Sequence, residues 1–544
     1  MKLVKSLLLG SAAGLCAVAG AQAADLPMRK AAPVEYVRVC TAYGAGFFYI
    51  PGTDTCLRVG GRVRFDYHFT SQNSRSTSQS GFIGLGRLNI DARTQTPYGT
   101  LRAFVRFDIA SRNGVGIVNS STQTRYANSF RGDGPDTASQ AQKFVNVDKA
   151  FVQFAGITAG RAQSFYDFYA GDLEFMGAGV YSQANTNLLA YTATFGGGFS
   201  ATVSMEDPTF RRQPVFFQGT LGVSAAAAAG GVPAAQVGGS AFLAGSVPVA
   251  FVPTAFNAAG TPTAAIALDT AQRLYLPDFV AALRYDAAWG SAQVSGAVHE
   301  IKTGAFTGGS FAVNGGAGVA AFTPRIPEAE YGFAFQGGVK VNLPMLAPGD
   351  QLWLQGAYGE GAMQYTGVNG PGGSEGNTAG TTNRFTINTN DAVLDVGGNL
   401  RKTQSFSVTA AALHYWTPEI RQAVFGTYGN VNYDGRLRVS NFGPAGLQGT
   451  GGAGAGAVTA VNPFNSTLMD WEVFYGGSNL IWSPVRDLDI GVEVVYQRHW
   501  LPNRVADANK GGAAAIGGTT VTGTGRTTSV DDTILARFRV QRDF

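Results

Sequence analysis

The sequence has little charge and no long apolar segment in its interior. Asp, Glu, Lys and Arg make up 14% of the 544 residues, and the formal net charge is only +4. A nucleic-acid-binding chain would need a strong basic excess, so nucleic acid is not an expected partner. Beyond the first residues, no uninterrupted apolar run reaches the length of a membrane-spanning helix. The longest apolar stretch, residues 221–260, mixes Ala, Gly, Val and Pro and is interpreted as a low-complexity loop.

Motifs for catalysis and cofactor binding are also missing. The four histidines, His68, His299, His414 and His499, are scattered and none lies near a cysteine, which argues against a metal site. The sequence contains no H-E-x-x-H and no P-loop lysine. Residues 449–454 fit G-x-G-x-x-G, but they lie in a Gly-rich stretch with no helix after it. We therefore expect neither an enzyme nor a bound cofactor.

The first residues are typical of a secretory signal peptide. Lys2 and Lys5 precede a short apolar run, and residues 21–23 read Ala-Gln-Ala, the A-x-A pattern of a cleavage site. We expect residues 1–23 to be removed and residues 24–55 to form an N-terminal segment on the periplasmic side. Export leaves two cysteines, Cys40 and Cys56, which suggest one disulfide. Two free buried thiols remain the alternative.

What the sequence has in excess is glycine and aromatic residues arranged in alternating patterns. Glycine accounts for 74 residues and aromatics for 11%. Side chains alternate between the two faces of a strand, and every Arg and Asp within residues 57–69, 82–94 and 101–109 falls on one face. Charges would be costly in a dry core unless they were paired. The charged face is therefore expected to line a water-filled lumen, with the apolar face towards lipid.

Two kinds of connection separate these segments. Tight turns are expected near residues 96–99, 155–157, 196–198, 289–291, 346–350, 417–419 and 483–487. Long polar or Gly-rich segments are expected around residues 70–80, 111–142, 167–187, 207–277, 303–328, 364–403, 434–469 and 501–529. Seven tight turns and eight long loops require sixteen strands. Short turns on one rim and long loops on the other are typical of an all-β transmembrane antiparallel β-barrel in the outer membrane.

The last strand and the first mature segment support this interpretation. Residues 533–544 alternate and end on Phe544, which we expect to act as an assembly signal on the closing strand. Residues 37–61 contain both cysteines, a Tyr-Gly-Ala-Gly core and an Ile-Pro-Gly-Thr step into the first strand. This stretch closely resembles the alphaproteobacterial general porin family. The resemblance implies a sixteen-stranded homotrimeric porin over residues 56–544, whose third long loop folds into the lumen.

The third loop by strand count is residues 167–187, and it supplies acids for a pore constriction: Asp167, Asp172 and Glu174. A basic wall is expected opposite, on strands one to three and sixteen. Its members are Arg58, Arg62, Arg64, Arg87, Arg93, Arg102, Arg106, Arg537 and Arg539. Acids that face a basic wall set up a transverse field, and fixed charges of this kind bias the choice of ions. The alternatives are that the acids only hold the loop to the wall, or that the loop is exposed.

The sequence thus predicts an outer-membrane porin of a Gram-negative bacterium, a passive channel for small hydrophilic solutes and ions. The expected partners are outer-membrane lipid and lipopolysaccharide, two further copies of the chain, the outer-membrane assembly machinery and the solutes. Two alternatives stay open. One is a substrate-selective channel, and the other is a surface adhesin that acts through the long loops at 207–277 and 364–403.

Overall fold

The computed structural model describes most of the chain outside the first residues and parts of the long loops. The described residues are 38–71, 79–113, 142–177, 179–213, 215–217, 235–237, 240–243, 247–258, 262–312, 325–368, 374–375, 387–395, 398–438, 470–506 and 527–544. They belong to two compact units, an N-terminal one that ends at Arg58 and a larger one that begins at Val59. The expected signal peptide, residues 1–23, lies outside the described residues.

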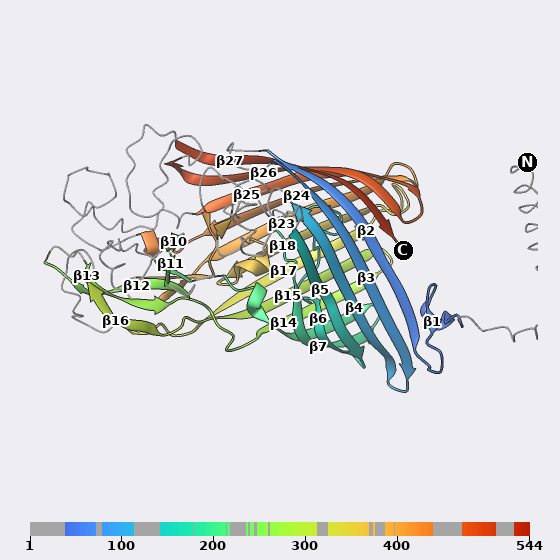
Figure 1. Cartoon of the computed structure of the whole chain (residues 1–544), viewed down its shortest axis with the longest axis horizontal. Helices are drawn as coiled ribbons and strands as arrows, with labels where there is room; N and C mark the ends of the chain where they lie inside the picture. Colours follow the sequence, from blue (N-terminus) through green and yellow to red (C-terminus); the bar gives the residue numbers. More distant parts are fainter. Residues whose placement is uncertain are drawn as a thin grey trace, which may run out of the picture. The chain divides into compact units, whose positions relative to one another are not determined.

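Sixteen antiparallel strands form a closed barrel, as the sequence predicts (Figure 1). Each strand pairs with the next barrel strand along the chain, and the last pairs back onto the first, from Arg62 opposite Asp543 to Thr70 opposite Leu535. Closure leaves no edge strand among these sixteen, which is what a sheet inside hydrocarbon requires. The strands are β2 (Cys56–Thr70), β3 (Ser80–Thr96), β4 (Gly99–Asn113), β5 (Gln142–Phe154), β6 (Ile157–Gln163), β7 (Asn185–Gly196), β8 (Phe199–Glu206), β14 (Asp278–Ala287), β15 (Gly290–Ile301), β17 (Glu330–Asn342), β18 (Gln351–Glu360), β23 (Gln404–Tyr415), β24 (Ile420–Asn432), β25 (Trp471–Val485), β26 (Leu488–Ala506) and β27 (Thr527–Asp543).

Short and long connections alternate along the barrel at the expected places. One of the two-residue turns is Ala155-Gly156 between β5 and β6, where φ is 49° and 85°. Positive φ angles at both turn residues are typical of the tight hairpin turn that matches the twist of antiparallel strands. The long connections named below are the third loop (residues 164–184), the fourth loop (207–277), the fifth loop (302–329) and the sixth loop (361–403).

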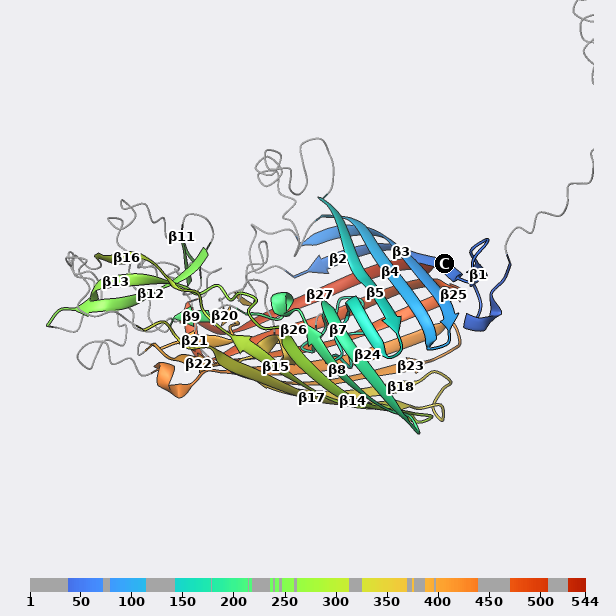
Figure 2. The same ribbon diagram turned by 90° about the horizontal axis from the view of Figure 1, so that it is seen from below.

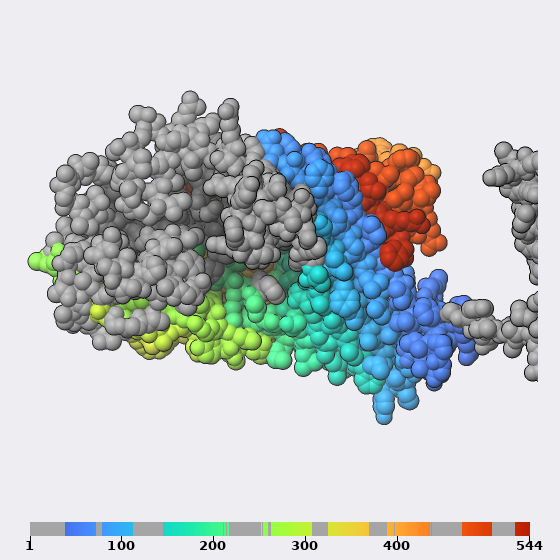
Figure 3. Space-filling view, in the orientation of Figure 1, coloured from blue at the N-terminus to red at the C-terminus, as the bar shows by residue number. Residues whose placement is uncertain are grey.

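The outer face of the barrel is apolar and the inner face is polar. Many of the outward side chains expose more than half of their surface, among them Val63, Ile109, Val203, Val294, Phe335 and Val424. The outer surface of β2–β4, blue in Figure 3, is uncovered in that view. Inward neighbours such as Asp66 and Asp108 are buried inside the barrel. Apolar atoms facing outward and charges facing inward are the arrangement that a lipid environment requires.

The chain closes the barrel with Phe544 next to Gly61. The backbone N–H of Phe544 donates to the oxygen of Gly61 over 3.0 Å, and Gly61 N–H donates back over 2.8 Å. A Cβ atom on Gly61 would lie 2.4 Å from both the Arg87 carbonyl oxygen and the Phe544 ring. Glycine is therefore required for this close approach, and the terminal aromatic ring packs where β2 has no side chain.

The N-terminal unit is held by the disulfide Cys40–Cys56, which confirms that pairing. Both cysteines are buried with Phe47, and Tyr43 and Tyr49 pack against them. The strand β1 (Phe48–Tyr49) pairs with the start of β2, and a short 3-10 turn, η2 (Thr41–Tyr43), follows Cys40. So small an apolar cluster gives little stability alone, and the covalent bond compensates for it.

Replacing both cysteines by serine is expected to destabilise this segment by about 3 kcal/mol, because a loop of roughly 15 residues regains its freedom when unfolded. Limited proteolysis of the folded protein would report faster cleavage within residues 38–56. The barrel should keep its resistance to heat in detergent. Equal protease resistance of the variant and the parent protein would contradict the prediction.

The apolar stretch at residues 221–260 is not simply a loop, so that expectation is partly wrong. Within it lie β10 (Ala235–Val237), β11 (Ser240–Leu243) and β12 (Val247–Phe256), which join β13 (Pro262–Asp269) and β16 (Phe306–Ala312) of the fifth loop. Figure 2 shows β12, β13 and β16 side by side. The Val and Phe residues of β12 are strong strand formers, and pairing with the neighbouring strands β11 and β13 overrides the Ala/Gly composition.

Smaller elements complete the fourth, sixth and seventh connections. Strands β9 (Val215–Phe217), β21 (Ala392–Leu394) and β22 (Leu400–Lys402) form one small sheet, and β19 (Ser374–Glu375) and β20 (Ile387–Asn388) form another. The helical segments are 3-10 turns, which include η3 (Pro208–Phe210), η4 (Met363–Thr366) and η6 (Gly435–Arg438). Within the described ranges, no helix has both the length and the apolar character needed to cross a membrane.

Candidate pore constriction

The inward arginines of the larger unit are paired with acids of the wall itself. Three arginines each meet one carboxylate: Arg62 meets Asp543 at 2.6 Å, Arg87 meets Asp108 at 2.6 Å, and Arg106 meets Asp148 at 3.3 Å. Arg93 and Arg102 both contact Asp91, at 2.8 and 2.9 Å. Arg64 and Arg539 both contact Asp66, at 3.2 and 2.7 Å. Arg58 belongs to the N-terminal unit, where its side chain lies beside Gly46. The sequence placed these arginines on the inner face but did not identify their partners.

Several arginines share one carboxylate, so the wall keeps an excess of positive charge. Asp66 is contacted by Arg539, by Arg64 and, at 3.8 Å, by Arg537. Arg539 meets Asp66 through two parallel hydrogen bonds of 2.7 and 3.1 Å, the geometry in which a guanidinium binds a carboxylate best. Shared pairing fixes the direction of each side chain.

The third loop enters the lumen along β15, β17 and β18. The carbonyl oxygen of Tyr166 accepts hydrogen bonds of 2.8 Å from Ser295 Oγ and from Gln336 Nε2. The Tyr169 N–H donates to Gln355 Oε1 over 2.8 Å. All three side chains project from the inner face of the barrel wall. The first part of the loop therefore lies against the inside of the barrel.

The tip of the third loop reaches the opposite strands. The N–H groups of Phe175 and Met176 donate to the two oxygens of Glu493 on β26, over 2.6 and 2.8 Å. The Phe175 carbonyl oxygen accepts from Arg537 and Arg539 of β27, each over 3.0 Å. The loop thus crosses the interior, which confirms that it folds into the lumen.

The loop returns along β23 and β24. Val180 N–H donates to Thr427 Oγ1 over 2.9 Å, and the Val180 carbonyl oxygen accepts from Thr409 Oγ1 over 3.2 Å. The loop ends at Ala184, and β7 begins at Asn185, close to the expected bounds. Backbone groups that would be unpaired in a buried loop are satisfied by side chains of the wall, which explains how a segment without regular structure can lie inside the barrel.

The three expected acids of the loop have different surroundings. Asp167 is buried, and its Oδ1 lies 3.0 Å from Arg211 Nη2. Glu174 accepts hydrogen bonds from the Tyr169 and Tyr181 hydroxyls over 3.0 and 2.9 Å. Burial, followed by the charge of Glu174, raises the pKa of the Tyr169 hydroxyl, which keeps it protonated as a donor.

Asp172 is the exposed acid of the three. Its carboxylate is attracted by two cations from different parts of the wall, Lys149 on β5 and Lys340 on β17. Lys149 was not singled out from the sequence, because alternation after the inward Asp148 would place it on the outer face. The register between β4 and β5 shifts at Asp148, which strand alternation alone does not predict. Arg211 was also missed, because it lies in the fourth loop and nothing in its local sequence points to a partner in the third.

Comparison with known proteins identifies the family of the chain. A family model described as Porin subfamily matches residues 25–517. Porin Omp2b of Brucella suis biovar 1 (strain 1330) is 39% identical over 214 residues, which are 37% of this chain and 54% of the relative. Porin Omp2b of Brucella canis is 38% identical over the same shares. The chain therefore spans about half the length of the curated relatives it matches.

Solved structures with a similar architecture are more distant in sequence. The outer membrane channel DcaP of Acinetobacter baumannii has a TM-score of 0.46 and 12% identity, with 91% of this chain and 99% of that chain covered. The in-vitro folded outer membrane protein OmpT of Vibrio cholerae has a TM-score of 0.40 and 8% identity, with the same shares covered.

Proposed function

The chain belongs to the porin subfamily, and from this membership we propose that it forms a water-filled channel for passive diffusion of small hydrophilic solutes and ions. The observation that carries the proposal is the third loop, which crosses a barrel lined with charge and leaves Asp172 exposed. A closed barrel of this family is an outer-membrane protein of a Gram-negative bacterium. Membership of the family also indicates a channel rather than an enzyme.

The constriction of this channel lies between the third loop and the arginines of β2–β4 and β27. Asp172 supplies the negative side, together with the more enclosed Asp167 and Glu174. Charges of opposite sign across a narrow passage orient polar solutes and water as they pass. The wall carries more cations than acids, which favours small anions over cations of equal size. Passage is driven by the solute gradient alone.

The partners follow from the membrane location. The apolar outer face contacts lipid and lipopolysaccharide, three copies assemble into a homotrimer, and the assembly machinery of the outer membrane inserts the barrel with Phe544 as part of its signal. Removal of residues 1–23 at export precedes this step, and residues 24–55 then lie at the periplasmic end. Cross-linking of the purified protein in detergent would test the trimer.

Purified protein in a planar lipid bilayer tests the channel directly. We expect discrete, stable steps of conductance and a reversal potential in a salt gradient whose sign reports anion preference. Saturable block of the current by one solute would instead identify a substrate-selective channel. Protein that inserts into the bilayer and gives no conductance steps would refute the proposal.

Replacing Arg106 by alanine is expected to shift the reversal potential towards cation preference without impairing assembly. Arg106 is held in the lumen by Asn89 at 3.0 Å and Asp148 at 3.3 Å, and its removal frees the negative charge of Asp148. The matched control is Arg106→Lys, which keeps the charge and should keep the parental reversal potential. A reversal potential that is the same in all three proteins would show that this position does not face the ion path.

A second candidate function, binding at the cell surface, is favoured by one observation. The fourth and fifth loops form a five-stranded sheet, and β9 of the fourth loop joins β21 and β22 of the sixth. These segments share an apolar core that includes Val215, Leu268, Leu394 and Leu400. Folded loops of this kind present a defined surface. Deletions in them that abolish attachment to a ligand while conductance persists would support this function.

A further inference from the structure

The start of the fourth loop turns back towards the third loop instead of leading away from the barrel. Asp207 caps the turn η3, because its Oδ1 accepts a hydrogen bond from Thr209 N–H over 2.9 Å. Pro208 sets the backbone of the first turn residue. The turn ends at Arg211, whose side chain is almost completely buried. The local sequence thus delivers a cation into the interior.

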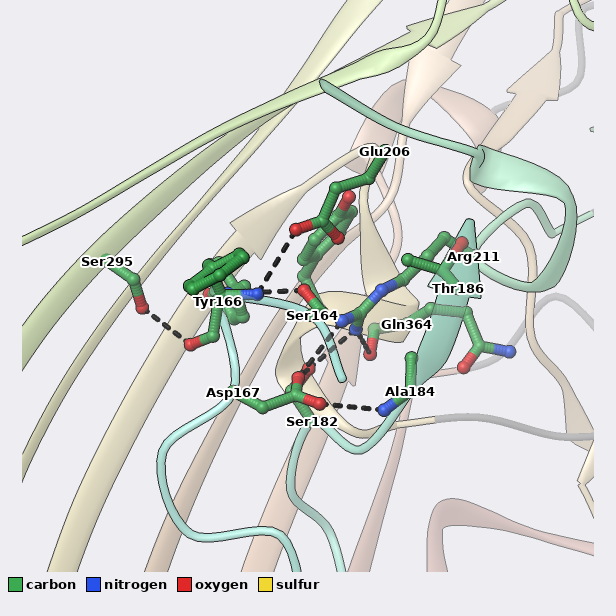
Figure 4. Close-up of polar contacts among 12 residues, drawn as sticks. Ser164, Tyr166, Asp167, Ser182, Ala184, Thr186, Glu206, Arg211, Ser295 and Gln364 are labelled. Carbon is green, nitrogen blue, oxygen red and sulfur yellow. Dashed lines mark hydrogen bonds and ion pairs between the residues drawn. The ribbon is translucent and has the colours of Figure 1, made fainter. Parts of the chain in front are cut away.

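Arg211 contacts both ends of the third loop at once (Figure 4). Its Nη2 donates to Asp167 Oδ1 on the entering side over 3.0 Å. Its Nη1 donates to Ser182 Oγ on the returning side over 2.6 Å. We call these two ends, residues 164–167 and 182–184, the neck of the third loop.

Asp167 joins the same two ends from within the loop. Its Oδ1 accepts from Ser182 Oγ over 2.6 Å, and its Oδ2 accepts from Ala184 N–H over 2.8 Å. The ion pair between Asp167 and Arg211 is therefore buried at the centre of the neck. Removing one partner of a buried pair leaves an uncompensated charge, which is far more disruptive than removing both.

The sixth loop lies against the other side of the guanidinium. The centre of the Tyr365 ring in η4 is 4.2 Å from Arg211 Cζ, and the Gln364 carbonyl oxygen is 3.5 Å from Nη1. Tyr365 is itself fixed, because its hydroxyl donates to Asp278 Oδ2 over 2.6 Å. Cation–π contact with a buried ring adds to the attraction of the ion pair.

A buried carboxylate fixes the fourth loop to the sixth just beyond Arg211. Asp391 Oδ2 accepts from Gln213 N–H over 2.7 Å, and its Oδ1 accepts from Met363 N–H over 3.2 Å. The His299 ring lies between two carboxylates, with Nε2 3.4 Å from Asp391 Oδ2 and Nδ1 2.8 Å from Asp278 Oδ1. The segments on both sides of the guanidinium are thus held in place, so Arg211 cannot follow the neck if the neck moves.

We propose that Arg211 is a positioning residue of the pore, which clamps the neck of the third loop and couples the constriction to the fourth and sixth loops. The role rests on the proposed function, since it concerns the width and charge of the same channel. The neck sets the spacing between the two sides of the loop. Loss of the clamp lets residues 171–177 take more than one position, so the channel loses its single conductance level.

The test compares Arg211→Met, Arg211→Lys and the double variant D167N/R211M with the parent protein. Arg211→Met keeps the length of the side chain and strands the Asp167 charge, so conductance should switch between several levels. Amides of residues 164–184 should exchange with deuterium about tenfold faster or more, because the neck opens more often. Arg211→Lys should be intermediate. The double variant strands no charge and should assemble, but it also lacks the clamp, so it should still show faster exchange and several conductance levels.

The matched control is Arg273→Met, which removes an exposed arginine of the same loop that pairs with the buried Asp269 rather than with the third loop. If Arg211→Met and Arg273→Met both keep the amide exchange rates of the parent protein and a single conductance level, the proposed clamp is wrong. If Arg211→Met does not assemble, the double variant decides, since a clamp predicts that it assembles and a general requirement for Arg211 predicts that it does not. A parent protein without conductance would refute the proposed function, while hydrogen exchange would still decide the role of Arg211.

Discussion

Replacing Phe107 by arginine is expected to lower the free energy of unfolding of the barrel in lipid by about 2–4 kcal/mol. Phe107 lies on the outer face of β4, between Leu88 of β3 and Val147 of β5 in register, and both neighbours are exposed to the membrane. A guanidinium at this depth must be dehydrated or must pull water and headgroups into the bilayer. The neighbouring positions Arg106 and Asp108 face the lumen, where a charged side chain need not be dehydrated.

Reversible unfolding in urea with lipid vesicles would measure this loss. Phe107→Leu is the matched control, because it keeps an apolar side chain at the same site and should cost much less. Arg106→Ala provides the comparison for the inner face and should fold as the parent does. Similar losses for Phe107→Arg and Arg106→Ala would show that the two faces of β4 have been assigned incorrectly.

The second large effect is expected for Glu493→Ala, which should release the tip of the third loop from the wall. Glu493 is fully buried on β26 and accepts from Phe175 N–H, Met176 N–H and Asn479 Nδ2. Each donor left unpaired costs about 1–3 kcal/mol unless the loop moves to water. We therefore expect the loop to move, with a larger and noisier conductance and a lower thermal stability.

Single-channel recording and thermal unfolding in detergent would separate these consequences. Glu493→Gln keeps one acceptor oxygen of the same geometry and should give a smaller change in conductance than Glu493→Ala. A conductance identical to the parent in Glu493→Ala, together with lower stability, would mean that the Phe175 carbonyl contacts with Arg537 and Arg539 suffice to hold the tip.

The barrel could be predicted from the sequence because its information is local. Alternation in residues 57–69 and 101–109 assigns the faces of two strands without reference to any partner. Turn residues such as Ala155-Gly156 mark the ends of hairpins, and counting them gives the number of strands. The third loop, by contrast, was placed in the lumen through resemblance, since nothing in residues 164–184 alone requires it to turn inward.

The pairings inside the pore could not be predicted, because they depend on register and on the path of the loops. Arg87 meets Asp108 only because β3 and β4 pair with these two residues opposite each other. Arg211 meets Asp167 across 44 positions of sequence, after both loops have folded into the barrel. The strands β10–β12 escaped detection because the Ala/Gly-rich composition around them resembles that of a loop.

The neck clamp makes the first residues of the fourth loop, Asp207 to Gln213, intolerant of a change in length. A single residue inserted between Asp207 and Arg211 would rotate the guanidinium away from Asp167. A peptide displayed on this protein should therefore not be inserted between Asp207 and Gln213, where it would disturb the contact between Arg211 and the third loop.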